Sequence, residues 1–345
     1  MRVLQVDSGR EWRGGQNQVR LLCRELARDA DVEQLLVTRQ DGELARRAAA
    51  DGVTVRGTAW EIGLDPRAWW QLRRTISAFQ PDIIHAHDSH GLTLAATLAM
   101  GRTLVAARRV DFHVGRFGAW RRPDRIIAVS EAVKQVLIGD GLAADAITVV
   151  LDGIDPDEIR QAAVPPLDIR SQLHLSPQAL LAVNAAALVD HKDHKTLIRA
   201  AHAARTLEPQ LHWVIAGEGP QREALTAEIT RLGLQDRVHL VGWIDRIEAL
   251  IAAANVFVMS SKLEGLGSVI LNALALGQPV VATAAGGIPE ILPPEFLVPP
   301  GAAEALAHKV ADVLHNPRFV PPPFPPRFTA RSMAGHVLDV YRALL

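Results

Sequence analysis

The chain has 345 residues, of which 48% are hydrophobic and 22% are charged. This length exceeds the size at which one hydrophobic core usually keeps growing, so we expect two domains. A formal net charge of −1 gives no general attraction to nucleic acid or to anionic lipid. The single cysteine, Cys23, excludes an intrachain disulfide framework and favours a reducing compartment.

The first residues, MRVLQVDSG, predict a strand and not a signal peptide, because no long apolar stretch follows them. No apolar run approaches the roughly 20 residues that a membrane span needs. We therefore expect a cytoplasmic protein whose contact with a membrane, if any, is peripheral, at the inner face of the plasma membrane. Cys23 recurs at helical spacing with Val19, Leu22 and Leu26, so it is expected in a core.

Short apolar runs alternate with amphipathic helical patterns such as Gln16–Ala30 and Lys195–Ala204. This alternation favours an α/β fold with parallel sheets built from right-handed crossovers. The predicted strands are Val3–Val6, Gln34–Val37, Ile83–His85, Thr103–Ala107, Ile126–Val129, Thr148–Leu151, Leu181–Ala185, His212–Ile215, Val238–Val241, Val256–Met259 and Pro279–Thr283.

The expected domains are residues 1–160 and 161–327, with a last amphipathic helix over 328–345 that packs back on the first domain. The stretch Asp157–Ser176 contains Pro165-Pro166 and no strong periodicity, so it is predicted to be a linker that leads into a helix. Residues 317–326 contain PPPFPP, which fits neither a helix nor a central strand.

The most informative segment follows the predicted strand Val256–Met259. An acidic residue lies in a glycine-rich turn, Glu264-Gly265-Leu266-Gly267, and a helix is predicted from Ser268 to Gly277. Free amides at a helix N-terminus favour phosphate, whereas Glu264 suits an uncharged, hydroxylated part of the same ligand. A nucleotide sugar supplies both groups.

The same segment resembles the signature of the retaining GT-B glycosyltransferases of family 4, also called glycosyl transferases group 1. Further blocks match in the family's order, and they are Gly14-Gly15, HKDHKTL at 191–197, GEGP at 217–220, VGW at 241–243 and GGIPE at 286–290. The resemblance implies two doubly wound, Rossmann-like domains facing across a cleft. It also implies sugar transfer from a nucleotide sugar with retention, without a metal or other cofactor.

The resemblance implies a role for each matching residue on the donor side. Glu264 contacts hydroxyls of the transferred sugar, and Lys192 neutralises the departing diphosphate. Asn272 stands where the family has a second glutamate that accepts from the ribose, and Ala187 stands where an arginine is common. The remaining donor-binding candidates are Gly14, Gly15, Glu218, Trp243, Gly265, Leu266 and Gly267.

The acceptor side carries weaker motifs. Many members of the family have a histidine after the fourth strand, where this chain has Arg109, so Arg109 and His113 are the catalytic candidates there. His87, Arg108 and Asp111 are candidates for the acceptor, which the resemblance implies is a glycan or a lipid-linked sugar of the cell envelope.

Two other patterns leave alternatives open. His85, His87 and His90 suggest zinc, but no carboxylate or cysteine pattern completes a site, so we expect no metal. Basic and aromatic residues between 108 and 125, including Arg116 and Phe117, suggest contact with anionic lipid or a phosphorylated acceptor. Nucleic acid is not expected, because no binding motif accompanies them.

Two alternative functions remain. A nicotinamide-dependent oxidoreductase would carry G-x-G-x-x-G at the first strand–helix turn, whereas this turn reads DSGREWRGGQNQ. A nucleotide-sugar-binding protein of the same fold with weakened catalysis would explain Asn272 and Ala187.

Overall fold

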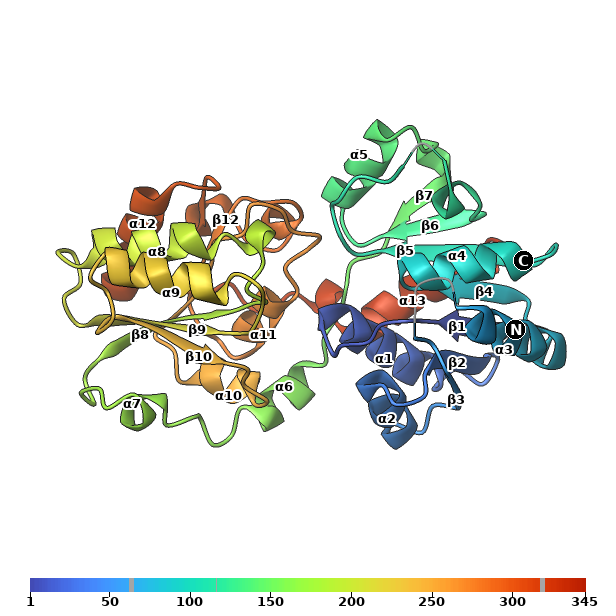
Figure 1. Cartoon of the computed structure of the whole chain (residues 1–345), viewed down its shortest axis with the longest axis horizontal. Helices are drawn as coiled ribbons and strands as arrows, with labels where there is room; N and C mark the ends of the chain where they lie inside the picture. Colours follow the sequence, from blue (N-terminus) through green and yellow to red (C-terminus); the bar gives the residue numbers. More distant parts are fainter. Residues whose placement is uncertain (62–64, 116, 317–319) are drawn as a thin grey trace. The chain divides into compact units, whose positions relative to one another are not determined.

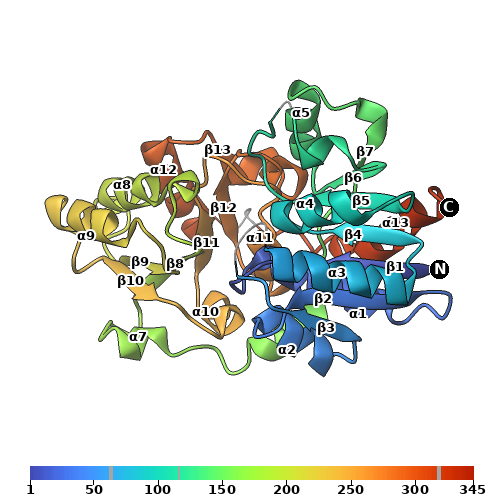
Figure 2. The same cartoon turned by 45° about the vertical axis from the view of Figure 1, so that its right-hand side comes forward.

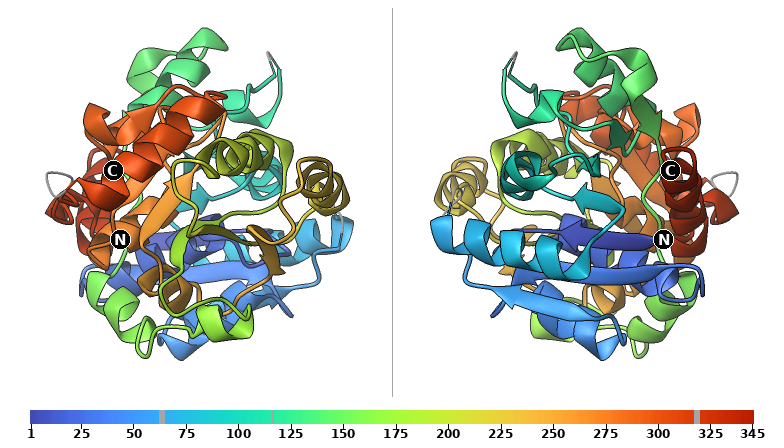
Figure 3. Two further views of the ribbon diagram at one scale, coloured as in Figure 1. Left: turned by 90° about the vertical axis from the view of Figure 1, so that its left-hand side faces the viewer. Right: turned by 90° about the vertical axis from the view of Figure 1, so that its right-hand side faces the viewer.

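The computed structural model describes residues 1–61, 65–115, 117–316 and 320–345. The chain forms two compact units (Figure 1). Unit 1 comprises Met1–Ile154 and Pro326–Leu345, and unit 2 comprises Asp155–Pro325. Both chain ends therefore belong to unit 1 (Figure 3). Arg116 and residues 317–319, which the sequence analysis discussed, lie outside the described residues.

Unit 1 is built on a parallel sheet whose described strands follow the order β3-β2-β1-β4-β5-β6-β7. These strands are β1 (Arg2–Val6), β2 (Glu33–Arg39), β3 (Val55–Thr58), β4 (Ile83–Ala86), β5 (Thr103–Arg108), β6 (Arg125–Ala128) and β7 (Ile147–Val149). The helices are α1 (Gly14–Leu26), α2 (Glu43–Ala50), α3 (Pro66–Phe79), α4 (Ser89–Leu98), α5 (Glu131–Gly139) and α13 (Ala330–Arg342).

Helices cover both faces of this sheet. Helices α1 and α13 pack together over one face, and α3 and α4 pack over the other (Figure 1). Neighbouring strand residues such as Val3 and Leu4 point into opposite cores, and both are fully buried. A parallel sheet covered on both faces explains why its strands are continuous apolar runs.

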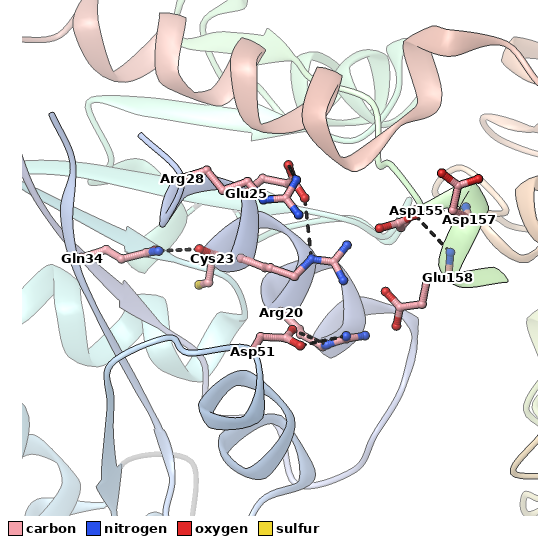
Figure 4. A network of polar contacts seen from close by, with 10 residues as sticks. Arg20, Cys23, Glu25, Arg28, Gln34, Asp51, Asp155, Asp157 and Glu158 are labelled. Atoms are coloured by element: carbon pink, nitrogen blue, oxygen red, sulfur yellow. Dashed lines mark hydrogen bonds and ion pairs between the residues drawn. The ribbon is translucent and has the colours of Figure 1, made fainter. Parts of the chain in front are cut away.

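The helix α1 carries the predicted core cysteine, which is fully buried. Burial raises the pKa of the Cys23 thiol, and its backbone carbonyl accepts from the Gln34 amide (Figure 4). Arg20 makes two bonds to Asp51, of 2.7 and 3.1 Å, and thereby ties α1 to the end of α2. The core assignment of Cys23 is confirmed.

Unit 2 repeats the architecture around a parallel sheet of order β10-β9-β8-β11-β12-β13 in the described residues (Figure 2). Its strands are β8 (Leu180–Ala185), β9 (Leu211–Ala216), β10 (Val238–Gly242), β11 (Val256–Met259), β12 (Val280–Thr283) and β13 (Leu297–Val298). Its helices are α6 (Pro156–Ala162), α7 (Ile169–Gln172), α8 (His194–Ala204), α9 (Arg222–Arg231), α10 (Ile247–Ala252), α11 (Val269–Ala275) and α12 (Ala303–His315).

The stretch Asp157–Ser176, predicted to be a linker, instead contains two short helices. Asp155 accepts from the amides of Asp157 and Glu158 and caps α6 (Figure 4). Asp168 caps α7 by accepting from Ser171. These helices are too short to show a clear apolar period, so the capping residues were the better signal. Among the described residues, no helix has the length and apolar character that crossing a bilayer requires.

Candidate functional site

The strand order of unit 2 reverses between β8 and β11. The chain runs from β8 to β9 and β10 on one side, and from β11 to β12 and β13 on the other. Open α/β sheets bind ligands at the carboxyl ends of the two strands on either side of such a reversal. Lys192 and Glu264 come from the loops that follow β8 and β11.

The Lys192 ammonium contacts Glu264 Oε2 directly. Lys192 ends the short 3₁₀ helix η3 (Asp190–Lys192) after β8, and Glu264 lies between β11 and α11. Their side chains are 18% and 12% exposed. The structure thus brings the two principal predicted residues together, 72 positions apart in sequence.

Hydrogen bonds fasten the two loops to each other. The Ser260 hydroxyl donates to the Lys192 carbonyl at 3.0 Å, and the Lys262 amide donates to the His191 carbonyl at 2.8 Å. The Ser261 hydroxyl donates to Glu264 Oε2 at 3.1 Å. The positions of the ammonium and the carboxylate are therefore set by both loops.

The GGIPE block lies behind Glu264. Gly286 adopts a positive φ of 50°, and a Cβ there would lie 1.7 Å from the Glu264 carbonyl oxygen. The Gly287 amide donates to the same oxygen at 3.2 Å. Glycine at 286 is thus required for the close approach of the two loops.

A buried polar pair joins the end of β8 to the start of α8. His194 Nε2 lies 3.2 Å from Asn184 Oδ1, and the Asn184 amide donates to the Val258 carbonyl of β11 at 2.9 Å. Burial, followed by the nearby Lys192 charge, lowers the pKa of His194 to about 4. His194 is therefore neutral at pH 7, and Lys192 carries the positive charge beside Glu264.

The remaining donor-side candidates lie on neighbouring loops of unit 2. The loops after β9 and β10 meet where the Gly217 amide donates to the Gly242 carbonyl at 2.8 Å. Glu218 accepts from Arg222 at 3.0 Å, and Trp243 is 59% exposed with its indole nitrogen bonded to Asp245. Trp243 is therefore not a core residue.

The helix that follows Glu264 differs from the one that the sequence predicted. The helix predicted over 268–277 is the shorter α11, and the Ser268 side chain makes no capping bond to it. Gly265, Leu266 and Gly267 are buried in the loop ahead of this helix. The Asn272 side-chain amide donates to Glu248 of α10 at 3.3 Å, so a carboxylate lies beside the position where the family has its second glutamate.

In unit 1 the strand order reverses between β1 and β4. The Ser8 amide donates to Asp88 at 2.6 Å, and the Gly9 amide donates to Asp7 at 2.9 Å. Burial, and then the charge of Asp88, raise the pKa of Asp7 to about 7. This reversal therefore brings two carboxyl groups together, and the sequence analysis singled out neither of them.

Gly14 and Gly15 are the first residues of α1, whereas the predicted helical pattern begins at Gln16. A Cβ at Gly15 would meet no atom of the chain within 4 Å. The fold itself therefore does not require glycine at position 15.

The acceptor-side candidates fall into two groups. Arg109 donates to Asp152 at 3.2 Å and lies 3.4 Å from His87 Nδ1, and Arg108 donates to the Phe112 carbonyl. His113 instead pairs with Asp140 at 2.7 Å, and its side chain is 81% exposed. Asp111 lies on the loop between Arg109 and His113.

Asp152 is the partner of Arg109 that sequence reasoning missed, although it follows the predicted strand Thr148–Leu151. The rule that ligands meet the carboxyl ends of parallel strands applies to it as to His87. His85 is buried and bonds to Tyr341, so it is turned to a different partner from His87. Within the described part of the chain, no three histidine, cysteine or acidic side chains are arranged to hold a metal ion.

Comparisons with known proteins agree with this architecture. The Anabaena HepE crystal structure in complex with UDP and glucose superposes with a TM-score of 0.84, covering 99% of this chain and 100% of that chain at 21% identity. Sucrose-phosphate synthase from Thermosynechococcus elongatus superposes with a TM-score of 0.74 at 21% identity, covering 100% and 99%. Two doubly wound, Rossmann-like units of this kind make up the GT-B fold of glycosyltransferases.

The family follows from the sequence matches. The model for glycosyl transferases group 1 matches residues 168–327, and the model for Glycosyltransferase Family 4 matches residues 12–158. The chain is 27% identical to the 2-deoxystreptamine glucosyltransferase of Streptomyces kanamyceticus, over 80% of this chain and 71% of the relative. It is also 27% identical to the lipopolysaccharide core biosynthesis glycosyltransferase LpsD of Rhizobium meliloti (strain 1021), over 83% and 79%. The chain belongs to the family 4, group 1 glycosyltransferases.

Proposed function

We propose that this glycosyltransferase moves a sugar, with retention and without a metal ion or other cofactor, from a nucleoside diphosphate sugar to an acceptor. The acceptor we propose is a glycan or a lipid-linked sugar in the synthesis of cell-envelope polysaccharide or lipopolysaccharide. The observation that carries the donor assignment is the direct contact of Lys192 with Glu264 at the strand reversal of unit 2.

The two charges have separate tasks. When the sugar–phosphate bond breaks, negative charge builds on the leaving oxygen, and the Lys192 ammonium stabilises it. The Glu264 carboxylate accepts hydrogen bonds from sugar hydroxyls. Without donor the two groups neutralise each other, and donor binding replaces this contact with one partner for each charge.

The nucleotide lies along the adjoining loops in this proposal. The amides of Gly265, Leu266 and Gly267 share the diphosphate charge with Lys192. The exposed face of Trp243 and the Glu218 side chain lie at the carboxyl ends of β10 and β9 and are assigned to the nucleoside. In unit 1, Gly15 is separately assigned to close approach of a ligand, because no neighbouring side chain of the fold needs the space.

Asn272 departs from the family glutamate, and Glu248 compensates for it in our proposal. The Asn272 amide holds the Glu248 carboxylate at 3.3 Å, so the pair presents the negative charge that the single asparagine lacks. We assign the ribose hydroxyls to this pair.

The acceptor assignment uses unit 1. Arg108 and Arg109 supply positive charge at the carboxyl end of β5, which suits an acceptor carrying phosphate or carboxylate. His87, Asp111 and His113 complete the assigned group. The relatives act on different acceptors, including the 2-deoxystreptamine and lipopolysaccharide core of their names. The likeness to LpsD supports an envelope glycan.

We further propose a cytoplasmic location with peripheral contact to anionic lipid. The buried single cysteine suits a reducing compartment. Helix α3 contains three arginines and no acidic residue, and its Trp70 is 52% exposed with the Arg74 guanidinium 4.2 Å from the ring centroid. Phe117, after β5, is 93% exposed. Tryptophan and arginine together suit the headgroup region of a bilayer.

A thermal-shift screen with uridine, guanosine and adenosine diphosphate sugars tests the donor assignment. Ligand at 100 times its dissociation constant adds roughly 2.7 kcal/mol to the free energy of unfolding. UDP-glucose is the first probe, because Anabaena HepE has also been crystallised with it. Release of nucleoside diphosphate on adding acceptor distinguishes transfer from a protein that only binds. Product NMR identifies retention at the anomeric carbon.

A further inference from the structure

A chain of buried side chains in unit 1 joins the C-terminal helix to the carboxyl end of β5. Arg109 Nη1 lies 3.4 Å from His87 Nδ1, and His87 Nε2 lies 2.7 Å from Gln5 Oε1. The Gln5 amide donates to the Tyr341 hydroxyl at 3.3 Å, and that hydroxyl lies 2.6 Å from His85 Nδ1. Gln5, His85, His87 and Tyr341 are at most 7% exposed.

The direction of every hydrogen bond in this chain follows from Arg109. An arginine only donates, so His87 Nδ1 must accept and the His87 proton resides on Nε2. Nε2 then donates to Gln5 Oε1, which turns the Gln5 amide group towards the Tyr341 oxygen. Burial and the charge of Arg109 lower the pKa of both His85 and His87 well below the usual range, so both rings are neutral.

The same logic fixes the tautomer of His85. The Tyr341 oxygen accepts from Gln5, so its own proton is available for His85 Nδ1. The opposite arrangement would leave a fully buried hydroxyl proton without an acceptor, which costs about 1–3 kcal/mol. His85 therefore carries its proton on Nε2.

The Nε2 atom of His85 is buried and has no protein partner, and the same holds for Nε of Arg108. Both residues line one cavity of about 10 Å³, together with Asp152 and Arg109. The other lining side chains, among them Leu22, Ile127 and Met333, are apolar. Two buried donors of different residues thus adjoin one small space that contains a carboxylate on its wall.

We propose that this cavity binds a single water molecule as a permanent part of unit 1. The water accepts from His85 Nε2–H and Arg108 Nε–H and donates to the Asp152 carboxylate. The cavity matches the roughly 10–15 Å³ that one water needs, and three partners are the usual number for a buried water. Asp152 disfavours a halide ion in the same place, because its carboxylate needs a hydrogen-bond donor and a halide ion has no proton to donate.

This water has a consequence for Arg109. In this proposal the water donates to the Asp152 carboxyl group, and Arg109 donates to the same carboxyl group at 3.2 Å. Arg109 is thereby fixed through two routes, one through Asp152 and the water, and one through His87, Gln5 and Tyr341. In this arrangement Tyr341 is a positioning residue, and the inference does not depend on which donor or acceptor the enzyme uses.

The tautomer is measured by long-range ¹⁵N–¹H NMR correlation of the imidazoles in the full chain, and the water is located by crystallography with and without bromide. We expect His85 protonated at Nε2 only, and one solvent peak between His85, Arg108 and Asp152 without anomalous signal. Tyr341 is the only tyrosine in the chain, so its ring signals identify its neighbour His85 without ambiguity.

The variant Tyr341→Phe removes only the hydroxyl group, and it should change the His85 nitrogen shifts while His87 keeps its tautomer. Should this variant not fold, the measurement on the parent chain decides alone. A proton on His85 Nδ1, an empty cavity in a high-resolution crystal structure, or an anomalous bromide peak in the cavity would each overturn the proposal.

Discussion

The two strand reversals of this molecule have the same topology and opposite chemistry. In unit 2 the loops after β8 and β11 bring together an ammonium and a carboxylate, Lys192 and Glu264, which compensate each other. In unit 1 the loops after β1 and β4 bring together two carboxyl groups, Asp7 and Asp88, and burial raises the pKa of Asp7 to about 7.

This difference indicates which kind of ligand each strand reversal can bind. A paired cation and anion can each exchange its partner for a matching group of a ligand, so the strand reversal of unit 2 suits a ligand with an anionic and a neutral end. Asp7 and Asp88 instead accept from backbone amides of Gly9, Ser8 and the first turn of α4. They shape the loop that leads to Gly14 and Gly15, and Arg109 is the positive charge that acts on Asp7 there.

The largest effect is expected from removing the cation of unit 2. Lys192→Met should lower the rate of nucleoside diphosphate release by roughly 100- to 1000-fold, the usual loss for one donor to a developing negative charge. The matched control is Lys195→Met, an exposed lysine three residues later, which should keep the parent rate. Equal rates for both variants would remove Lys192 from the site.

The carboxylate should act on the sugar and not on the nucleotide. Glu264→Gln should lower the binding affinity for UDP-glucose by about 10- to 100-fold, because hydrogen bonds to a charged group contribute about 1.5–3 kcal/mol. The affinity for UDP should remain within a few-fold of the parent. Calorimetric titration of both ligands measures this, with the exposed Glu304→Gln as control. A uniform loss for UDP and UDP-glucose would contradict the assignment of Glu264 to sugar hydroxyls.

The raised pKa of Asp7 in unit 1 leads to a prediction about how stability depends on pH. A carboxyl group with a raised pKa binds an extra proton in the folded state, so between its ordinary value of 3.8 and about 7 the protein loses stability as pH rises. Asp7→Asn removes this loss, and its Oδ1 still accepts from Gly9. Urea unfolding should show the variant more stable than the parent by up to roughly 4 kcal/mol at pH 8, since each unit of pKa difference corresponds to about 1.4 kcal/mol.

This gain should vanish below about pH 3, where the parent Asp7 is largely protonated in both states. The exposed Asp41→Asn should show no such pH dependence. A difference between Asp7→Asn and the parent that is constant from pH 4 to pH 8 would mean that Asp7 is ionised in the folded protein throughout.

The smallest effect concerns the ribose. Glu248→Gln should lower the binding affinity for UDP by about three- to tenfold, the usual range for one hydrogen bond near 1 kcal/mol. Asn272→Asp should weaken it too, because a second carboxylate would lie 3.3 Å from Glu248 and repel it. If Glu248→Gln leaves UDP binding unchanged, the compensation by Glu248 is wrong.

Much of this fold could be predicted from the sequence, because the central strands are continuous apolar runs such as Val256–Met259. Two edge strands were missed. The strand β3 contains Arg56 and Gly57, and β13 has only two residues, so neither has an apolar run to detect. Local periodicity also extended α1 to Ala30, whereas the helix ends at Leu26.

The site divides in the same way. The motif order predicted Lys192 and Glu264, and their contact confirms that these two side chains meet. The hydrogen bond from Gln5 to Tyr341 spans 336 positions and joins a strand to the last helix, so no local sequence pattern predicts it. The pairing of Asn272 with Glu248 depends on how α10 packs on α11, which the sequence does not specify residue by residue.

The most direct test exchanges the two charges of unit 2 in the double variant Lys192→Glu with Glu264→Lys. The exchange keeps an ion pair between the loops, so the thermal midpoint should stay near that of the parent. UDP-glucose binding and nucleoside diphosphate release should still be lost, because the cation and the carboxylate then face the wrong ends of the donor. Turnover near the parent rate in this variant would contradict the account, since it would mean that the pair only holds the two loops together.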